Sequence, residues 1–239
     1  MEPILKVLIS NFQHIVILLG FVLITTGCKD NSTKQNEVET TREIETKTQE
    51  ISTKTEKKVI LCFGNSLTAG YGLDDERTWW TSLLQERIDS LDLEYSVVNA
   101  GLSGEATSEG TQRIGWVLNQ SVDIFILELG ANDMLRGLAA ENTKNNLEEI
   151  IKKVKAKNED IKIVIAGMLA PPNMGKDYEK AFNGAFSSLA KEYNASLIPF
   201  FLEGVALNPD LNLPDGKHPN ADGQKIVLEN VWKALEKNL

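Results

Sequence analysis

Histidine is scarce in this chain, whose 239 residues contain only two, His14 and His218. So few imidazoles cannot supply the usual ligands of a zinc site, and the sequence predicts neither a metal centre nor a cofactor. Positive charge is also in deficit, because 25 lysines and arginines face 34 aspartates and glutamates, for a formal net charge of −9. A chain with this balance repels phosphates and lacks the basic face that binds nucleic acid. The sequence therefore argues against nucleic acid as a partner.

Cysteine is equally rare, and the two thiols lie in different surroundings. Cys62 belongs to the apolar stretch VILCFG, where a cysteine behaves as a small hydrophobic side chain. Cys28 follows the small residues TTG at 25–27, a pattern that resembles a bacterial lipobox, in which the thiol is acylated and becomes the new N-terminus. If Cys28 carries a lipid, no disulfide is available, and the folded domain must be stable through its core alone.

Hydrophobic runs long enough to span a bilayer are missing as well. The apolar run at 15–24 is shorter than the ~20 residues that a spanning helix needs, and Lys6 precedes it. This arrangement is typical of an export signal, so we predict that residues 1–27 form a lipoprotein signal peptide. An ordinary secretory signal and an uncleaved anchor remain alternatives, because Thr25 stands where lipoboxes usually carry leucine and Glu2 leaves the first residues poorly charged. The predicted location is the bacterial cell envelope, with a lipid anchor at the periplasmic face or the outer surface.

Residues 28–57 carry very few hydrophobic side chains. Beyond the first position of this stretch, only Val38, Ile44 and Ile51 are apolar. That is too little apolar surface to offset the conformational entropy of ordering the segment, so we predict a disordered polar tether. Because one histidine falls in the predicted signal peptide, the mature protein would keep only His218.

From residue 58 to residue 239, short β-branched apolar runs alternate with helical patterns. The runs are at 59–64, 95–101, 123–130, 161–169 and 196–201, and the helical patterns are at 78–91, 142–157, 177–193 and 220–239. Nearly continuous apolar runs are typical of parallel strands that are covered on both faces, and Asn142 is expected to cap the second helix. The alternation predicts one α/β domain with a parallel sheet, in which ligands bind beyond the carboxyl ends of the strands.

Four polar stretches follow those strands or precede the last helix. They read FGNSLTAGYG, NAGLSGEAT, LGANDMLRG and DGKHPN. Because the carboxyl ends of parallel strands meet at one edge of a sheet, all four stretches could converge there.

The side chains in these stretches could perform nucleophilic catalysis. The hydroxyl of Ser66 needs a base, and an imidazole, with an ordinary pKa of about 6.5, can take its proton. His218 is the imidazole that remains for this role, and Asp215, three residues earlier, could accept its other ring N–H. The N–H groups of Ser66 and Gly101 and the side-chain amide of Asn132 could stabilise an oxyanion.

Each of these residues also has a structural interpretation. Ser66 could cap a helix, Gly101 could be a turn residue, and Asn132 could cap a loop. His218 could be a surface side chain beside a turn aspartate. Taken together, however, all of them fall where an α/β sheet builds its site. The nucleophile elbow G-x-S-x-G of α/β-hydrolases is absent, because Leu67 and Thr68 follow the serine.

The four stretches, in this order, resemble the conserved blocks of the SGNH (GDSL-type) hydrolases across nearly all of residues 58–239. The segments VVNAGLSGEAT, ELGANDMLRG and LIPFFLEGVALNPD resemble most closely the periplasmic thioesterase, lysophospholipase and arylesterase subgroup. The resemblance implies a flavodoxin-like three-layer α/β/α sandwich with a five-stranded parallel sheet. It also implies that Ser66 is the nucleophile, His218 the base and Asp215 its orienting acid, with Gly101 and Asn132 as oxyanion donors.

One position departs from the family signature Gly-Asp-Ser-Leu, because Asn65 stands where the aspartate is expected. Asparagine is nearly isosteric with aspartate and keeps one acceptor oxygen while it loses the charge. The family's aspartate at this position is not the triad acid, so Ser66 remains the expected nucleophile. The change bears on the geometry and the pH response of this loop.

The stretch AGMLAPPNMG suggests where an acyl group would bind. Met168, Leu169 and Met174 could line an apolar groove, although a rigid proline turn with ordinary core residues is an equally good interpretation of Met168. One of the two tryptophans Trp79 and Trp80 is expected in the core.

We therefore expect a monomeric lipoprotein that hydrolyses small-molecule carboxylic esters or thioesters through an acyl-serine intermediate. A carbohydrate O-acetylesterase of the same family and a non-catalytic envelope scaffold remain the alternatives.

The predicted lipid anchor can be tested by replacing Cys28 with alanine, because acylation requires the thiol. The variant should move from the membrane fraction to the soluble fraction after cell disruption, as measured by fractionation and immunoblotting. Persistence of the Cys28→Ala variant in the membrane fraction would show that another segment holds the chain there.

Overall fold

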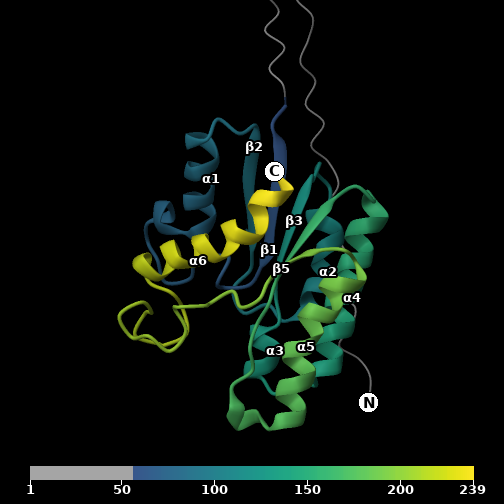
Figure 1. Cartoon of the computed structure of the whole chain (residues 1–239), viewed down its shortest axis with the longest axis vertical. Helices are drawn as coiled ribbons and strands as arrows, with labels where there is room; N and C mark the ends of the chain where they lie inside the picture. The colour runs from purple at the N-terminus through teal and green to yellow at the C-terminus, as the bar shows by residue number, and fades with distance from the viewer. Residues whose placement is uncertain (1–55) are drawn as a thin grey trace, which may run out of the picture. The chain divides into compact units, whose positions relative to one another are not determined.

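The computed structural model describes residues 56–239, and the predicted signal peptide, Cys28 and most of the predicted tether lie outside this range. The described residues contain the whole of the predicted α/β domain (Figure 1). Within this range, no helix is both long and apolar enough to cross a membrane.

A single parallel sheet forms the middle of the domain. Its strands lie in the order β2-β1-β3-β4-β5, and every neighbouring pair is parallel. The strands are β1 (Lys58–Gly64), β2 (Tyr95–Gly101), β3 (Ile124–Glu128), β4 (Lys162–Ala166) and β5 (Ser196–Ile198). The side chains of β3 are all buried, as are those of β4 after its first residue, since helices cover both faces of the sheet. The predicted five-stranded parallel sheet is therefore confirmed.

Three of the predicted strands are longer in the sequence pattern than in the structure. The runs at 123–130, 161–169 and 196–201 continue past the ends of β3, β4 and β5. Leu129 and Met168 follow the strands but remain buried, so their hydrophobicity reflects the core and not the sheet. Gly130, at φ 117°, then turns the chain from β3 into a short helix, a conformation that a residue with a β-carbon rarely adopts.

Helices cover the sheet in two outer layers. Helices α1 (Trp80–Ser90) and α6 (Ala221–Leu235) pack together on one face, and α4 (Ala140–Lys157) packs between α2 (Thr107–Val117) and α5 (Lys176–Glu192) on the other (Figure 1). The short helix α3 (Ala131–Leu135) and the 3-10 turns η1 (Glu76–Thr78), η2 (Pro172–Met174) and η3 (Glu236–Asn238) complete the domain. The three-layer α/β/α sandwich and its flavodoxin-like strand order are thus confirmed.

Two helices are absent from the sequence-based predictions because their apolar patterns are weak. Helix α2 packs in part through Gly110, where an added β-carbon would lie 2.6 Å from the Cδ1 atom of Leu129. Close approach through glycine leaves no hydrophobic signal in the sequence. Helix α3 has only five residues, too few for a periodic pattern to be recognised.

The predicted N-cap of α4 is wrong by three residues. The helix begins at Ala140, and Ala139, with no side-chain hydrogen bond, precedes it. The N–H of Asn142 bonds the carbonyl of Ala139, so Asn142 lies within the first turn and does not cap it. By contrast, Asn220 does cap α6, because its side-chain oxygen accepts hydrogen bonds from the N–H groups of Asp222 and Gly223.

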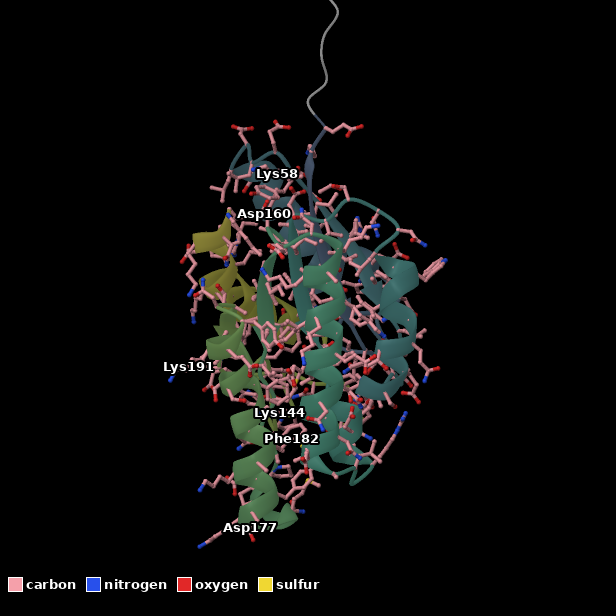
Figure 2. All side chains as sticks on the ribbon, turned by 90° about the vertical axis from the view of Figure 1, so that its right-hand side faces the viewer. Lys58, Lys144, Asp160, Asp177, Phe182 and Lys191 are labelled. Atoms are coloured by element: carbon pink, nitrogen blue, oxygen red, sulfur yellow. The ribbon has the colours of Figure 1, made fainter. Side chains whose placement is uncertain are left out.

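The outer face of α5 is polar and its inner face is aromatic. Figure 2 shows Lys191 and Asp177 projecting from this helix, whereas Phe182 is fully buried. The ring of Phe182 packs edge-on against Phe186, with ring centroids 5.3 Å apart. This division is the amphipathic pattern that predicted the helix.

On the opposite face, Trp80 is the buried member of the tryptophan pair. Its indole N–H donates to the carbonyl of Leu67 at 3.1 Å, and its backbone N–H donates to the side-chain oxygen of Gln224 on α6 at 3.0 Å. The side chain of Trp79 is half-buried and donates to the carbonyl of Leu73. Trp80 therefore links α1 both to the loop after β1 and to α6.

Candidate active site

The loop after β1 and the loop before α6 bring three polar side chains into contact. His218 Nε2 lies 2.8 Å from Ser66 Oγ, and His218 Nδ1 lies 2.5 Å from Asp215 Oδ2. Ser66 and His218 are 152 residues apart in sequence, so this contact is produced by the fold. The structure places the three predicted triad residues in one continuous chain of hydrogen bonds.

The carboxylate of Asp215 is fixed by its own loop. Its Oδ1 atom accepts the backbone N–H groups of Lys217 at 2.9 Å and His218 at 3.1 Å. Desolvation acts to raise the pKa of Asp215, but these N–H groups and the imidazole of His218 outweigh it and lower the pKa to about 2. At neutral pH Asp215 is therefore ionised and can only accept hydrogen bonds.

An ionised Asp215 determines which imidazole nitrogen carries the proton. Because the carboxylate can only accept, Nδ1 of His218 must donate to it, and in the neutral ring Nε2 is then an acceptor. The hydroxyl of Ser66 accordingly donates to Nε2. This is the arrangement that a general base needs in order to remove the serine proton.

Donors for a developing oxyanion lie around the same hydroxyl. Asn132, on α3, lines the same cavity as Ser66 and His218, and its Nδ2 atom donates to the carbonyl of Glu105 at 2.9 Å. That bond orients the amide and leaves its second N–H for a ligand. The backbone N–H groups of Ser66 and Gly104 have no hydrogen-bond acceptor within residues 56–239. Gly104 also lines the cavity.

The prediction of Gly101 as an oxyanion donor is wrong. Its N–H donates to the side-chain oxygen of Asn99 at 2.9 Å, and it is not among the residues that line the cavity of Ser66. An added β-carbon at Gly101 would lie 2.3 Å from the backbone nitrogen of Ala69, so the glycine permits close packing of β2 against the loop after β1. The segment GLSG has two glycines, and the second one, Gly104, reaches the site.

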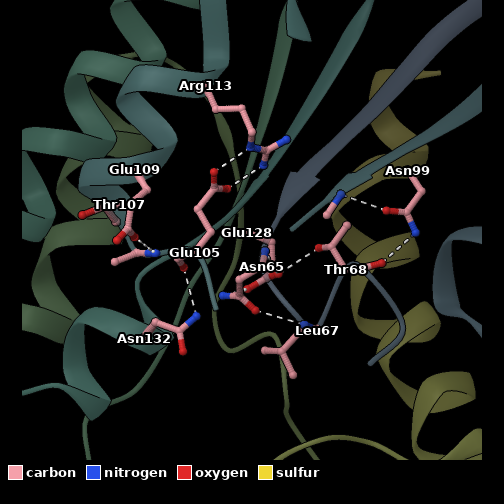
Figure 3. Close-up of polar contacts among 12 residues, drawn as sticks. Asn65, Leu67, Thr68, Asn99, Glu105, Thr107, Glu109, Arg113, Glu128 and Asn132 are labelled. Atoms are coloured by element: carbon pink, nitrogen blue, oxygen red, sulfur yellow. Dashed lines mark hydrogen bonds and ion pairs between the residues drawn. The ribbon is translucent and has the colours of Figure 1, made fainter. Parts of the chain in front are cut away.

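A buried ion pair holds the loop that carries Gly104. The side chain of Glu105 is buried and pairs with Arg113 through two contacts of 2.5 and 2.6 Å (Figure 3). The guanidinium of Arg113 also lies over the ring of Phe63. Arg136 also donates to the carbonyl of Gly104 at 2.5 Å. Sequence analysis missed this support, because nothing in the pattern pairs charges eight residues apart across a loop and a helix.

The triad opens into a cavity of about 690 Å³. Its walls are mostly apolar, and two predicted residues, the buried Met168 and the partly exposed Leu169, belong to them. Met174, the third predicted residue, does not line the cavity. Met134 and Leu135, from helix α3 that the sequence did not predict, line it in addition. A pocket of this size and polarity suits an acyl group with a few polar anchors.

Comparisons with known proteins match this geometry. Residues 62–226 match the GDSL-like lipase/acylhydrolase family. The chain is 36% identical over 180 residues to esterase TesA of Pseudomonas aeruginosa, which covers 75% of this chain and 88% of that protein. It is 36% identical over 178 residues to thioesterase 1/protease 1/lysophospholipase L1 of Escherichia coli, with coverages of 74% and 83%. A crystal structure of TesA has a TM-score of 0.72 at 36% identity and covers 76% of this chain and 100% of that one.

The charge of Asp215 can be tested with Asp215→Asn. We expect kcat to fall by roughly 10²–10⁴-fold, because the amide no longer imposes one imidazole tautomer on His218.

The stability of the wild type should also depend on Asp215, because a carboxylate whose pKa is lowered from 3.8 to about 2 stabilises the fold above pH 3.8. That contribution should disappear as the pH falls through about 2, as measured by denaturant unfolding at a series of pH values. Equal activity of Asp215→Asn and an exposed control, Asp74→Asn, would contradict the assignment.

The amide of Asn132 can be tested with Asn132→Ala. Removal of one oxyanion donor should lower kcat by roughly 10²–10³-fold with a smaller effect on KM, because the donor acts mainly on the transition state. Steady-state kinetics on a soluble ester measures both constants. A variant that changes KM alone would place Asn132 in substrate binding and not in catalysis.

Proposed function

This chain belongs to the GDSL-like lipase/acylhydrolase family and is an ester hydrolase, and we propose that it cleaves its substrates through an acyl-enzyme on Ser66. The family membership confirms the resemblance to the SGNH hydrolases. The observation that carries the proposal is the hydrogen-bond chain from Asp215 through His218 to Ser66, which ends at the wall of an apolar cavity.

The first half-reaction follows from the protonation states. Ser66 Oγ attacks the carbonyl carbon while its proton passes to His218 Nε2, and Asp215 stabilises the imidazolium that forms. The substrate oxygen becomes negative and receives hydrogen bonds from the N–H groups of Ser66 and Gly104 and from Asn132 Nδ2. When the tetrahedral intermediate collapses, the alcohol or thiol leaves with the proton from His218. The acyl group remains on Ser66.

The second half-reaction uses the same groups with water as the nucleophile. His218 Nε2 takes a proton from the water, which attacks the acyl carbon, and the oxyanion again forms among the three donors. Collapse releases the carboxylic acid and returns the proton to Ser66 Oγ. Every step draws on residues of one chain, which supports a monomer as the active form.

The substrate is a small-molecule ester or thioester, and we propose that its acyl part is a hydrocarbon chain. Met134, Leu135, Met168 and Leu169 offer apolar contacts along the cavity. The relatives include an esterase and a thioesterase/lysophospholipase, names consistent with acyl substrates. A sugar acetate would instead need several polar partners beyond the catalytic groups.

The proposed place of action is the bacterial cell envelope. The support is the sequence pattern at residues 1–28, which lies outside the described range and which the Cys28→Ala variant tests. The polar stretch at 28–57 would then separate the catalytic domain from the membrane surface.

A series of nitrophenyl esters of increasing chain length, with wild type and Ser66→Ala, tests the proposal. We expect kcat/KM to rise beyond the acetyl ester, and Ser66→Ala to lose at least about 10³-fold in kcat, because the nucleophile is removed. Activity that survives in Ser66→Ala would refute the acyl-enzyme. A maximum at acetyl groups on sugars would identify a carbohydrate O-acetylesterase, and an inactive wild type would identify a binding scaffold.

A further inference from the structure

A buried carboxyl group that the mechanism does not use lies directly behind the nucleophile. Glu128, the last residue of β3, is completely buried. Its carboxyl contacts the loop after β1 three times, through the backbone N–H of Asn65 at 3.1 Å, the Nδ2 atom of Asn65 at 3.0 Å and the hydroxyl of Thr68 at 2.8 Å (Figure 3). Within residues 56–239, no lysine, arginine or histidine forms an ion pair with it. Burial of a carboxyl group without a cationic partner costs folding free energy, so a role for Glu128 in the nucleophile loop would explain why it is there.

The orientation of the Asn65 amide is fixed by backbone groups. Its Oδ1 atom lies 3.0 Å from the N–H of Leu67, which can only donate, so Oδ1 is the acceptor and Nδ2 must face Glu128. The hydroxyl of Ser66 lies 3.4 Å from the same Oδ1 atom. Asn65 thus joins Glu128 to the peptide on the far side of the nucleophile, and the backbone of Ser66 is held between these two points.

The contacts show why a carboxyl group is needed at position 128. Oε1 receives the Nδ2 donor and Oε2 receives the backbone N–H of Asn65. A glutamine has only one oxygen and would turn its own NH₂ group toward one of these donors. The contact between Oε2 and the hydroxyl of Thr68 suits either protonation state of Glu128. The hydroxyl donates to an ionised carboxylate, and it accepts from a carboxyl that is protonated on Oε2. Desolvation raises the pKa of Glu128 to about 8, against hydrogen bonds from Thr68 and Asn65 that lower it.

We propose that Glu128 is a positioning residue for Ser66 that acts through Asn65, and that the amide at 65 and the carboxyl at 128 form a matched pair. The proposal rests on the role of Ser66 as nucleophile. An aspartate at 65, as in the Gly-Asp-Ser-Leu signature, would place two carboxyl oxygens about 3.0 Å apart where the structure has an N–H donor. Such a pair is complementary only while it holds a shared proton. The asparagine therefore removes a proton requirement from the nucleophile loop.

A cycle of three variants tests the pair. Asn65→Asp should keep wild-type kcat/KM at low pH and lose about 10-fold or more at alkaline pH, where the shared proton dissociates. Glu128→Gln should lose on the order of 10²-fold in kcat at every pH, because a displaced nucleophile loses its alignment. The double variant Asn65→Asp, Glu128→Gln exchanges amide and carboxylate, and should recover to within a few-fold of wild type without an added alkaline limb.

Exposed positions provide controls with the same chemical change. Asn119→Asp and Glu159→Gln should leave the pH profile of kcat/KM unchanged, since both side chains are exposed. Circular dichroism establishes that each variant is folded before its kinetics are measured. If Glu128→Gln does not fold, the double variant still decides the question, because the exchanged pair must restore both folding and activity.

Unfolding measurements test the same pair without any enzyme assay. A carboxyl whose folded pKa is raised from 4.5 to about 8 lowers the free energy of unfolding as the pH rises through that window. The wild type should therefore lose stability relative to Glu128→Gln, which has no carboxyl at either position, between pH 4.5 and about 8, and the difference should stay constant above it. If Ser66→Ala remains active, the proposed mechanism fails, but this unfolding comparison still tests the pair.

Two results would overturn the inference. One is an Asn65→Asp profile that matches the wild type at all pH values. The other is a double variant that is no better than Glu128→Gln, which would show that the two positions act independently.

Discussion

The hydrogen bond between Asp215 and His218 is the constraint on which the chemistry of this protein depends. An acceptor that stays ionised at neutral pH assigns the ring proton to Nδ1, and that assignment leaves Nε2 free to act on Ser66. The short loop from 215 to 218 supplies this constraint locally, because its own backbone N–H groups hold the carboxylate. The contact that depends on the whole fold is the one between His218 in this loop and Ser66, which follows β1.

Each loop around the nucleophile is held by a different buried carboxyl group. Glu105, paired with Arg113, holds the loop that carries Gly104, and Glu128, bonded to Asn65, holds the loop that carries the serine. The first carboxyl has a cationic partner and the second has only neutral donors. The same residue type thus serves as an ion-pair partner in one loop and as an acceptor for neutral hydrogen-bond donors in the other.

Sequence patterns predicted the parts of the molecule whose signal is local. The continuous apolar runs predicted all five strands, and the spacing of three positions from Asp215 to His218 indicated their pairing. The patterns failed where contacts depend on shape. Helix α2 was not predicted because Gly110 packs closely without a side chain and adds no hydrophobic residue to the pattern. Gly104 could not be distinguished from Gly101 as the residue at the site without knowledge of the backbone path. Glu128 reads as an ordinary end of a strand, since its partners lie about 60 residues away.

The contacts of Trp80 have a consequence for how this protein would lose activity on heating. The indole N–H of Trp80, on α1, donates a hydrogen bond to the carbonyl of Leu67, beside the nucleophile. The backbone N–H of Trp80 donates a second hydrogen bond to Gln224, in the helix that follows His218. The base and the serine are therefore kept in register by an outer layer of two helices and not by the sheet alone. Loosening of that layer would separate the reacting atoms while the five strands stay paired, so inactivation would precede the melting of the β-structure.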